Sequence, residues 1–235
     1  MKTKRLLLPF FGFIAAIALL LSILTAWSLY PHADFQALPA DLIAFDSEQG
    51  IDRLAASDAM ADYRPLLAHF EPQVAVSFCG VASSVAVLNA MGQHTTQVTF
   101  FNDHTDKVRH DWQVLFGGMS LDELAGLLRA RGATVIVQHA DTLGVDAFRE
   151  TVVRNLSTAG DYLLVNYQRE VLGQGKAGHI SPLAAYDRKS DSVLIMDTAA
   201  HKYPPTWVPL PLLLEAMKTV NGGSGKVRGF VEITP

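Results

Sequence analysis

The residue best suited to chemistry is Cys79, the only cysteine in the chain. Small, mostly apolar residues follow it, and the larger ones recur at spacings of four and three: Val81, Val85, Leu88 and Met91. This spacing predicts one face of a buried helix, which Gly92 can end in a left-handed conformation. Cys79 would then lie at a helix N-terminus, where the partial positive charge favours a thiolate. Taken alone, such a cysteine is more often a small buried hydrophobe.

Two further polar residues lie at the ends of predicted strands. His179 begins a strand over residues 179–186, and Asp197 ends a strand over residues 192–197. The polar turn 187–191 joins them as an antiparallel hairpin, which places these two ends side by side. Each residue alone fits a strand end equally well. Together with Cys79, however, they predict a nucleophile, a base and an aspartate that holds the imidazole tautomer.

The order Cys, His, Asp across a helix and a sheet resembles papain-like enzymes, in which Asn usually holds the third place. In those enzymes a glutamine six residues before the cysteine donates its amide to the developing oxyanion. Gln73 has this spacing from Cys79. Such a donor typically lowers the barrier by roughly 2.7–4 kcal/mol. A surface glutamine is the alternative interpretation of Gln73.

The elements that must position these residues are predicted as follows. Helices are expected over residues 79–91, 120–131, 143–156 and 210–219, and the second of these opens with a Ser120–Glu123 capping box. Strands are expected over residues 133–139, 161–167, 179–186, 192–197 and 228–233. An antiparallel sheet after a mainly helical half predicts an α+β domain, and the resemblance to papain-like enzymes implies a papain-like fold. Residues 94–118 are expected to form an irregular, solvated loop, since their histidines and carboxylates match no standard metal-ligand spacing.

The N-terminus is expected to lie outside this domain. After a basic start, residues 6–29 carry no charge and are long enough to span a bilayer, so they predict an uncleaved signal-anchor or a cleaved signal peptide. The basic flank would stay cytoplasmic, which places the rest on the exported, periplasmic side of a bacterial inner membrane. The predicted organisation is residues 1–30 as this segment, 31–62 as a linker and arm, and 63–235 as the catalytic domain.

Composition limits the remaining functions. The net charge of −4 and the 18% of charged residues do not suggest a nucleic-acid-binding protein. A single cysteine excludes an intramolecular disulfide and a multi-cysteine zinc site.

Several longer motifs resemble the catalytic domain of phytochelatin synthase in its short bacterial form. They are Phe78-Cys-Gly-Val-Ala-Ser83, Val165-Asn-Tyr167, Gly178-His-Ile-Ser-Pro-Leu-Ala-Ala-Tyr186, Ile195-Met-Asp197, Lys202-Tyr-Pro-Pro205 with Trp207-Val208, and Arg228-Gly-Phe-Val231. The resemblance implies that Cys79, His179 and Asp197 form the catalytic triad and that Gln73 is the oxyanion donor. It also implies that Cys79 attacks the Cys–Gly amide of glutathione and forms a γ-glutamylcysteinyl thioester. A second glutathione would then give a phytochelatin, and water would give γ-glutamylcysteine.

The resemblance also defines the expected partners. The substrate is glutathione or a glutathione S-conjugate, with cadmium or zinc entering as part of the thiolate substrate, and no tightly bound cofactor or protein metal site is expected. Short bacterial members of the family resemble glycine-releasing hydrolases, so hydrolysis is expected to dominate over transfer. Because the chain has one cysteine, metal activation through protein thiols is not expected. Arg228, and secondly Arg169, are predicted to bind substrate carboxylates. A homodimer is compatible with these expectations.

Two other functions fit part of the pattern. A papain-like peptidase of the bacteriocin-leader type would also use a glutamine six residues before the cysteine. A non-catalytic thiol or metal-binding protein could use Cys79 with the histidines of residues 94–118. The Lys-Tyr-Pro-Pro-x-Trp-Val motif favours phytochelatin synthase over the first, and a single cysteine is a poor metal trap, which argues against the second.

Overall fold

The computed structural model describes the backbone of residues 4–235 and side chains from Phe13 onward. Its centre is a seven-stranded antiparallel sheet with the strand order β1-β6-β5-β4-β3-β7-β2. In chain order the strands are β1 Ile43–Ala44, β2 Thr134–His139, β3 Tyr162–Gln168, β4 Gly178–Asp187, β5 Ser192–Ile195, β6 Thr206–Pro209 and β7 Gly229–Thr234. The five predicted strands correspond to β2, β3, β4, β5 and β7, and the predicted hairpin is β4–β5.

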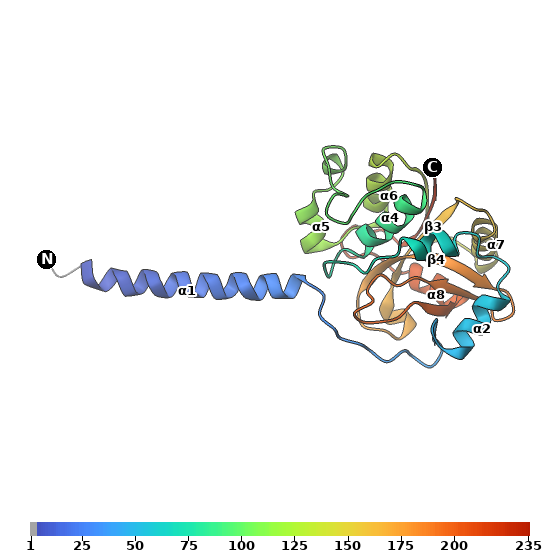
Figure 1. Cartoon of the computed structure of the whole chain (residues 1–235), viewed down its shortest axis with the longest axis horizontal. Helices are drawn as coiled ribbons and strands as arrows, with labels where there is room; N and C mark the ends of the chain where they lie inside the picture. The colour runs from blue at the N-terminus through green and yellow to red at the C-terminus, as the bar shows by residue number, and fades with distance from the viewer. Residues whose placement is uncertain (1–3) are drawn as a thin grey trace.

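Helices cover both faces of this sheet (Figure 1). The α-helices are α1 Lys4–Leu29, α2 Glu48–Ala56, α3 Tyr63–Ala68, α4 Cys79–Ala90, α5 Asp111–Gly117, α6 Leu121–Ala130, α7 Val145–Leu156 and α8 Leu210–Met217, and the 3₁₀ turns are η1 Thr105–Lys107 and η2 Arg169–Leu172. One core joins α4 and α6 to the sheet, and a second joins α7 and α8 to the opposite face. The predicted α+β class is confirmed, although helices also follow the first strands.

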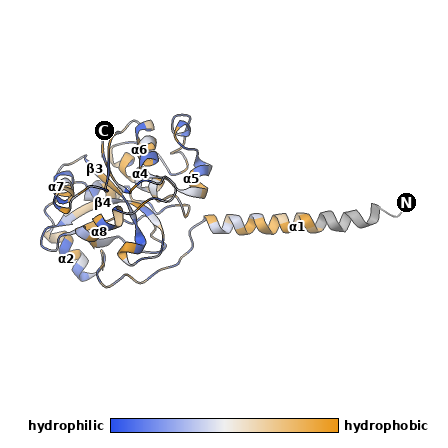
Figure 2. Ribbon diagram, turned by 180° about the vertical axis from the view of Figure 1, so that it is seen from behind, coloured by the Kyte–Doolittle hydropathy of each residue, from blue (hydrophilic) through white to orange (hydrophobic). Residues whose placement is uncertain are grey.

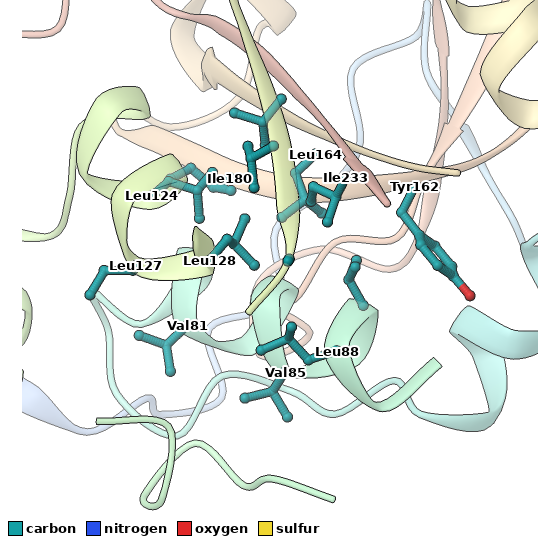
Figure 3. Packing of buried hydrophobic residues seen from close by; sticks show 14 of the residues in the cluster. Val81, Val85, Leu88, Leu124, Leu127, Leu128, Tyr162, Leu164, Ile180 and Ile233 are labelled. Atoms are coloured by element: carbon teal, nitrogen blue, oxygen red, sulfur yellow. The ribbon is translucent and has the colours of Figure 1, made fainter. Parts of the chain in front are cut away.

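Strand periodicity explains the two cores. Along β3, Leu163 and Val165 point into the core with α7 and α8, whereas Leu164 points into the core with α4 and α6. Because both faces are covered, β3 reads as a nearly continuous apolar run rather than an alternating one. Figure 3 shows side chains of α4 and α6 around Leu164, Ile180 and Ile233.

The helix predicted after Cys79 is confirmed as α4. Its residues 80–88 are all buried, so the helix is enclosed on every side rather than on one face. Gly92 has a φ of +89°, the left-handed conformation expected for the residue that ends it. Burial of this depth fixes the axis of α4, and therefore the position of Cys79 at its first turn.

Other local predictions succeeded or failed for identifiable reasons. The capping box is present, because Ser120 Oγ accepts from the Glu123 N–H and Glu123 accepts from the Ser120 N–H at 2.7 Å. The helix expected from residue 143 begins two residues later, after Gly144. Residues 94–118 were expected to be irregular throughout, but they contain η1 and α5, and α5 has its own capping box formed by His110 and Gln113.

The N-terminal helix α1 extends away from the globular part in Figure 1. Figure 2 shows that its described residues are largely hydrophobic, and most of their side chains are exposed. Among the residues whose side chains are described, no helix combines the length and hydropathy needed to cross a membrane. The predicted span, residues 6–29, begins at residues whose side chains lie outside that part, and it stays a prediction.

Residues 31–62, predicted as a linker and arm, also contribute regular structure. Strand β1 pairs with β6 at the sheet edge, with Ile43 opposite Trp207. The Trp207 indole N–H donates to the Gly50 carbonyl of α2 at 3.0 Å. Leu42 is buried in the core beside α7 and α8. The predicted arm does lie on the domain, and it forms one edge of the sheet.

Two neighbouring leucines of α3 provide a matched test of the core. Leu66 is 1% exposed and belongs to the core of α4 and α6, whereas Leu67 is 49% exposed. We expect Leu66→Ala to lower the free energy of unfolding by about 2–5 kcal/mol, because it removes buried contacts and leaves a cavity. Leu67→Ala should change it by about 0.5 kcal/mol or less. Equal values from urea unfolding would contradict the packing described for α3.

Candidate active site

The first turn of α4 packs closely on the start of β4. A Cβ atom on Gly80 would lie 2.6 Å from Met119 Sδ and 3.1 Å from Ile180 Cδ1, so glycine permits this approach. Ser83 ties the two elements together, because its hydroxyl donates to the Cys79 carbonyl at 2.7 Å and to the Ile180 carbonyl at 3.1 Å. These contacts place the Cys79 thiol beside His179, the residue before Ile180.

The β4–β5 hairpin brings His179 and Asp197 together as predicted. His179 Nε2 lies 2.9 Å from Asp197 Oδ1, and both residues are buried. The hydroxyl of Ser181 lies 3.0 Å from the same nitrogen. Because Nε2 faces Asp197 and Ser181, Nδ1 is the imidazole nitrogen left to face Cys79.

Asp197 has a second cationic partner that sequence analysis did not anticipate. One terminal nitrogen of Arg169 donates to both carboxylate oxygens of Asp197, at 2.7 Å and 2.6 Å. The other terminal nitrogen donates to Gln174 Oε1 at 2.6 Å, and the guanidinium lies 5.0 Å from the centre of the Tyr203 ring. Arg169 was predicted to bind a substrate carboxylate. Asp197 and Gln174 engage both of its terminal nitrogens, and its role in substrate binding stays a prediction.

These contacts shift three protonation equilibria in a consistent way. Burial raises the pKa of the Cys79 thiol, but the charge of His179, hydrogen bonds from His179 and the Ile180 N–H, and the charge of Arg169 outweigh it, so the pKa is lowered. Burial and the charge of Arg169 lower the pKa of His179. The charges of Asp197 and Cys79 and the hydrogen bond to Asp197 raise it by more, so the net pKa is raised. Burial opposes ionisation of Asp197, yet His179 and Arg169 hold its pKa well below the ordinary range. The arrangement therefore favours a thiolate–imidazolium pair.

Gln73 lines the same cavity as Cys79, and backbone groups hold it tightly. Its amide nitrogen donates to the carbonyls of Ala75 at 3.0 Å and Val76 at 2.7 Å, which uses both amide hydrogens. Its own N–H donates to the Thr198 carbonyl at 2.9 Å. Donation to an oxyanion would require one of the two amide bonds to be shared. The Cys79 N–H, in the first turn of a helix, has no intrahelical acceptor and is the other candidate donor. The oxyanion role of Gln73 stays a prediction.

Arg228 is a buried cation on the other side of His179. It is 7% exposed, and one terminal nitrogen donates to Asn166 Oδ1 at 3.1 Å. Among the described residues no carboxylate pairs with it, and its Nε has no acceptor. The Asn166 amide nitrogen is also buried without an acceptor. Sequence analysis predicted Arg228 as a carboxylate clamp and missed Asn166, although Asn166 lies within a quoted motif and one position before Tyr167, which pairs with His179 across β3 and β4.

These residues surround one open cavity of about 900 Å³. Its walls come from the segment before α4, the start of α6, the loops after β3 and β5, and the glycine-rich loop before β7. Cys79, Gln73, Arg169, His179 and Arg228 all line it, which places the predicted site residues other than Asp197 at a single surface. Asp197 lies behind His179. Among the described residues, no group of three or more His, Cys, Asp or Glu side chains could hold a metal ion.

Comparison with known proteins agrees with this geometry. A family model described as phytochelatin synthase matches residues 33–230, which is most of the chain. The chain belongs to the phytochelatin synthase family. The matched region begins within the N-terminal arm rather than at α3, so the family domain includes β1 and α2.

Individual members of the phytochelatin synthase family show the same relationship. The chain is 30% identical over 200 residues to glutathione gamma-glutamylcysteinyltransferase 2 of Arabidopsis thaliana, covering 83% of this chain and 44% of that protein. It is 32% identical over 201 residues to glutathione gamma-glutamylcysteinyltransferase 1 of Lotus japonicus, covering 82% and 40%. For the Schizosaccharomyces pombe enzyme of that name the identity is 28% over 207 residues, covering 84% and 50%. The chain therefore spans half or less of the length of these relatives.

The pKa of Cys79 can be tested directly, because it is the only thiol. We expect iodoacetamide to alkylate the native protein at pH values well below those an ordinary thiol requires, since the lowered pKa maintains a thiolate. His179→Ala removes the cation that stabilises the thiolate, so the pKa should rise and the alkylation rate at neutral pH should fall about tenfold or more. His104→Ala, an exposed loop histidine, is the matched control and should leave the profile unchanged. Superimposable profiles for wild type and His179→Ala would contradict the ion pair.

Proposed function

We propose that the protein is a glutathione γ-glutamylcysteinyltransferase that acts mainly as a hydrolase. The observation that carries the proposal is the Cys79 thiol with a lowered pKa beside the His179–Asp197 pair in a chain of the phytochelatin synthase family. The names of the relatives supply the substrate class. We also assign the helix and sheet arrangement to the papain-like class, on the Cys–His–Asp order and the position of Cys79 at the start of α4.

In the first half-reaction the Cys79 thiolate attacks the carbonyl carbon of the Cys–Gly amide of glutathione. The new C–S bond forms as the carbonyl oxygen takes up negative charge, which the Cys79 N–H and the amide of Gln73 can stabilise. The His179 imidazolium then transfers its proton to the glycine nitrogen. The C–N bond breaks, glycine leaves as an amine, and a γ-glutamylcysteinyl thioester remains on Cys79. Because Nε2 of His179 stays hydrogen-bonded to Asp197, Nδ1 carries the proton that is transferred.

In the second half-reaction His179, now neutral, removes a proton from the attacking group. Water yields γ-glutamylcysteine, and the amine of a second glutathione yields a phytochelatin with a new amide bond. In both cases the C–S bond breaks and the thiolate of Cys79 returns. A cadmium or zinc ion, where present, would enter bound to the thiolate of the substrate, as cargo rather than as a cofactor.

The buried cation Arg228 provides a site for the glutamyl half of the substrate. Its guanidinium has no carboxylate partner among the described residues, and it interacts electrostatically with the Cys79 thiolate. The free amide hydrogens of Asn166 lie beside it. A substrate carboxylate placed there would receive a charge-assisted hydrogen bond and would neutralise a buried charge.

The location of the protein is proposed on sequence grounds alone. The basic first residues and the uncharged residues 6–29 support a domain held on, or released to, the exported side of a bacterial membrane. Fractionation of cells that produce the full chain would test this. Recovery of the protein only with cytoplasmic markers would contradict it, and the size of the purified chain in solution would decide the homodimer.

Product analysis tests the proposed activity. We expect wild-type protein mixed with glutathione to release glycine and γ-glutamylcysteine in nearly equal amounts, with cadmium increasing the share of phytochelatin. Cys79→Ala should lower glycine release at least about 10³-fold, because the covalent route is lost. Cleavage of a Gly-Gly leader peptide without any glycine release from glutathione would contradict the proposal and favour the bacteriocin-leader type of peptidase.

Substitution of Arg228 separates binding from chemistry. We expect Arg228→Gln to raise the KM for glutathione about 10–100-fold with a smaller change in kcat, because it removes one charge-assisted contact with the substrate. Arg188→Gln, in the exposed turn between β4 and β5, should change neither constant. Thermal unfolding of both variants would verify folding. A fall in kcat alone, with KM unchanged, would argue against Arg228 as a substrate ligand.

A further inference from the structure

The first part of the N-terminal arm, residues 30–42, connects two parts of the cavity wall, at Val76 and at residues 201–202. Just before it, at the end of α1, the carbonyl of Leu29 accepts from the Val76 N–H at 2.9 Å. Further along, the Asp34 N–H donates to the His201 carbonyl at 2.9 Å and the Gln36 N–H donates to the Lys202 carbonyl at 3.0 Å. Val76, His201 and Lys202 all line the cavity, as do residues 34, 36 and 37 of the arm itself. The arm therefore forms part of the cavity wall, between Val76 and residues 201–202.

Side-chain contacts also fix the arm in place. Pro39 lies against Gly173, where a Cβ atom would come within 3.1 Å of the proline ring, and Gly173 has a φ of +73°. Leu42 is 5% exposed and belongs to the core of α7 and α8, and Leu38 packs against the same core. The C-terminal end of the arm is thus anchored in the core, while residues 32–37 run exposed along the surface.

The sheet order gives the positions of Arg228 and the arm relative to His179. His179 lies on β4, Asn166 on β3, and Arg228 immediately precedes β7, and these strands lie in the order β4-β3-β7. On the other side of β4 lies β5, and residues 199–203, which follow β5, hold the arm. Arg228 and the arm are therefore on opposite sides of His179. With the glutamyl half of the substrate toward Arg228, the departing residue points toward the arm.

We propose that the N-terminal arm sets the size of the group that can leave from the acyl-enzyme or attack it. The wall formed by residues 34, 36 and 37 admits a single small residue such as glycine and excludes a longer C-terminal extension. An acceptor amine takes the position that the leaving amine vacates, so the same wall disfavours a second glutathione relative to water. This inference rests on the proposed function, and it assigns the arm a role in specificity that the catalytic residues do not supply.

The test compares two substrates in the full chain: glutathione, and γ-glutamylcysteinyl-glycylglycine, whose leaving group is one glycine longer. Asp34→Pro/Gln36→Pro removes the two N–H donors that bond the arm to the carbonyls of His201 and Lys202, without touching the catalytic residues. Phe35→Pro is the matched control, since this 76% exposed residue contributes neither of those bonds. Ala37→Leu acts in the opposite direction, because it adds bulk to the arm wall without removing either bond.

We expect the wild type to discriminate between the two substrates by about 10–200-fold in kcat/KM, the range typical of steric exclusion. The double variant should reduce this ratio at least about threefold and raise the share of phytochelatin, Ala37→Leu should increase the ratio, and Phe35→Pro should leave it unchanged. If the wild type cleaves glutathione but the double variant and Ala37→Leu both show the wild-type ratio, the inference is overturned and the proposed function stands. A wild type that releases no glycine from glutathione would overturn both.

Discussion

The carboxylate of Asp197, buried between His179 and Arg169, is the interaction on which the site depends. A buried carboxylate is costly unless cations and hydrogen bonds surround it, and here two cations and the Ala199 N–H do so. Because Arg169 is permanently charged, Asp197 stays ionised whether or not His179 carries a proton. Asp197 can therefore stabilise an imidazolium without taking up the proton itself, and that imidazolium in turn favours the thiolate of Cys79.

The fold supplies this charge arrangement from four separate elements. Helix α4, buried on all sides, fixes Cys79; β4 carries His179; the end of β5 leads to Asp197; and the turn after β3 carries Arg169. In the thiolate–imidazolium state the four side chains sum to zero charge. Arg228 is left over on the far side of His179 as a buried positive charge, which is the feature expected of a site that awaits an anion. The two ends of the cavity thus differ, with Arg228 at one and the N-terminal arm at the other; in the proposed reaction these would face the acyl half and the leaving group.

Much of this was predictable because local rules determined it. The helix after Cys79 followed from apolar spacing, and the His179–Asp197 contact followed from a hairpin whose two strands and polar turn are clear in the sequence. The Arg169–Asp197 pair was not predicted because the fold sets it: strand periodicity does not indicate which charged side chain turns inward after β3. Asn166 was missed for a similar reason, since an asparagine within an apolar strand gains meaning only when its neighbour Arg228 is known. Helix α5 went unrecognised because its capping box starts with histidine. The arm was predicted, but its position along the cavity was not, because its contacts there are backbone hydrogen bonds, which are independent of side-chain identity.

The central claim is that Cys79 becomes covalently acylated by the γ-glutamylcysteinyl half of glutathione. Intact-mass spectrometry of the protein, quenched in acid shortly after mixing with glutathione, measures this species directly. The account predicts an added mass equal to glutathione minus glycine, located on the peptide that contains Cys79 and absent from Cys79→Ala. Turnover of glutathione with no such adduct, or with a mixed disulfide as the only modification of Cys79, would contradict it.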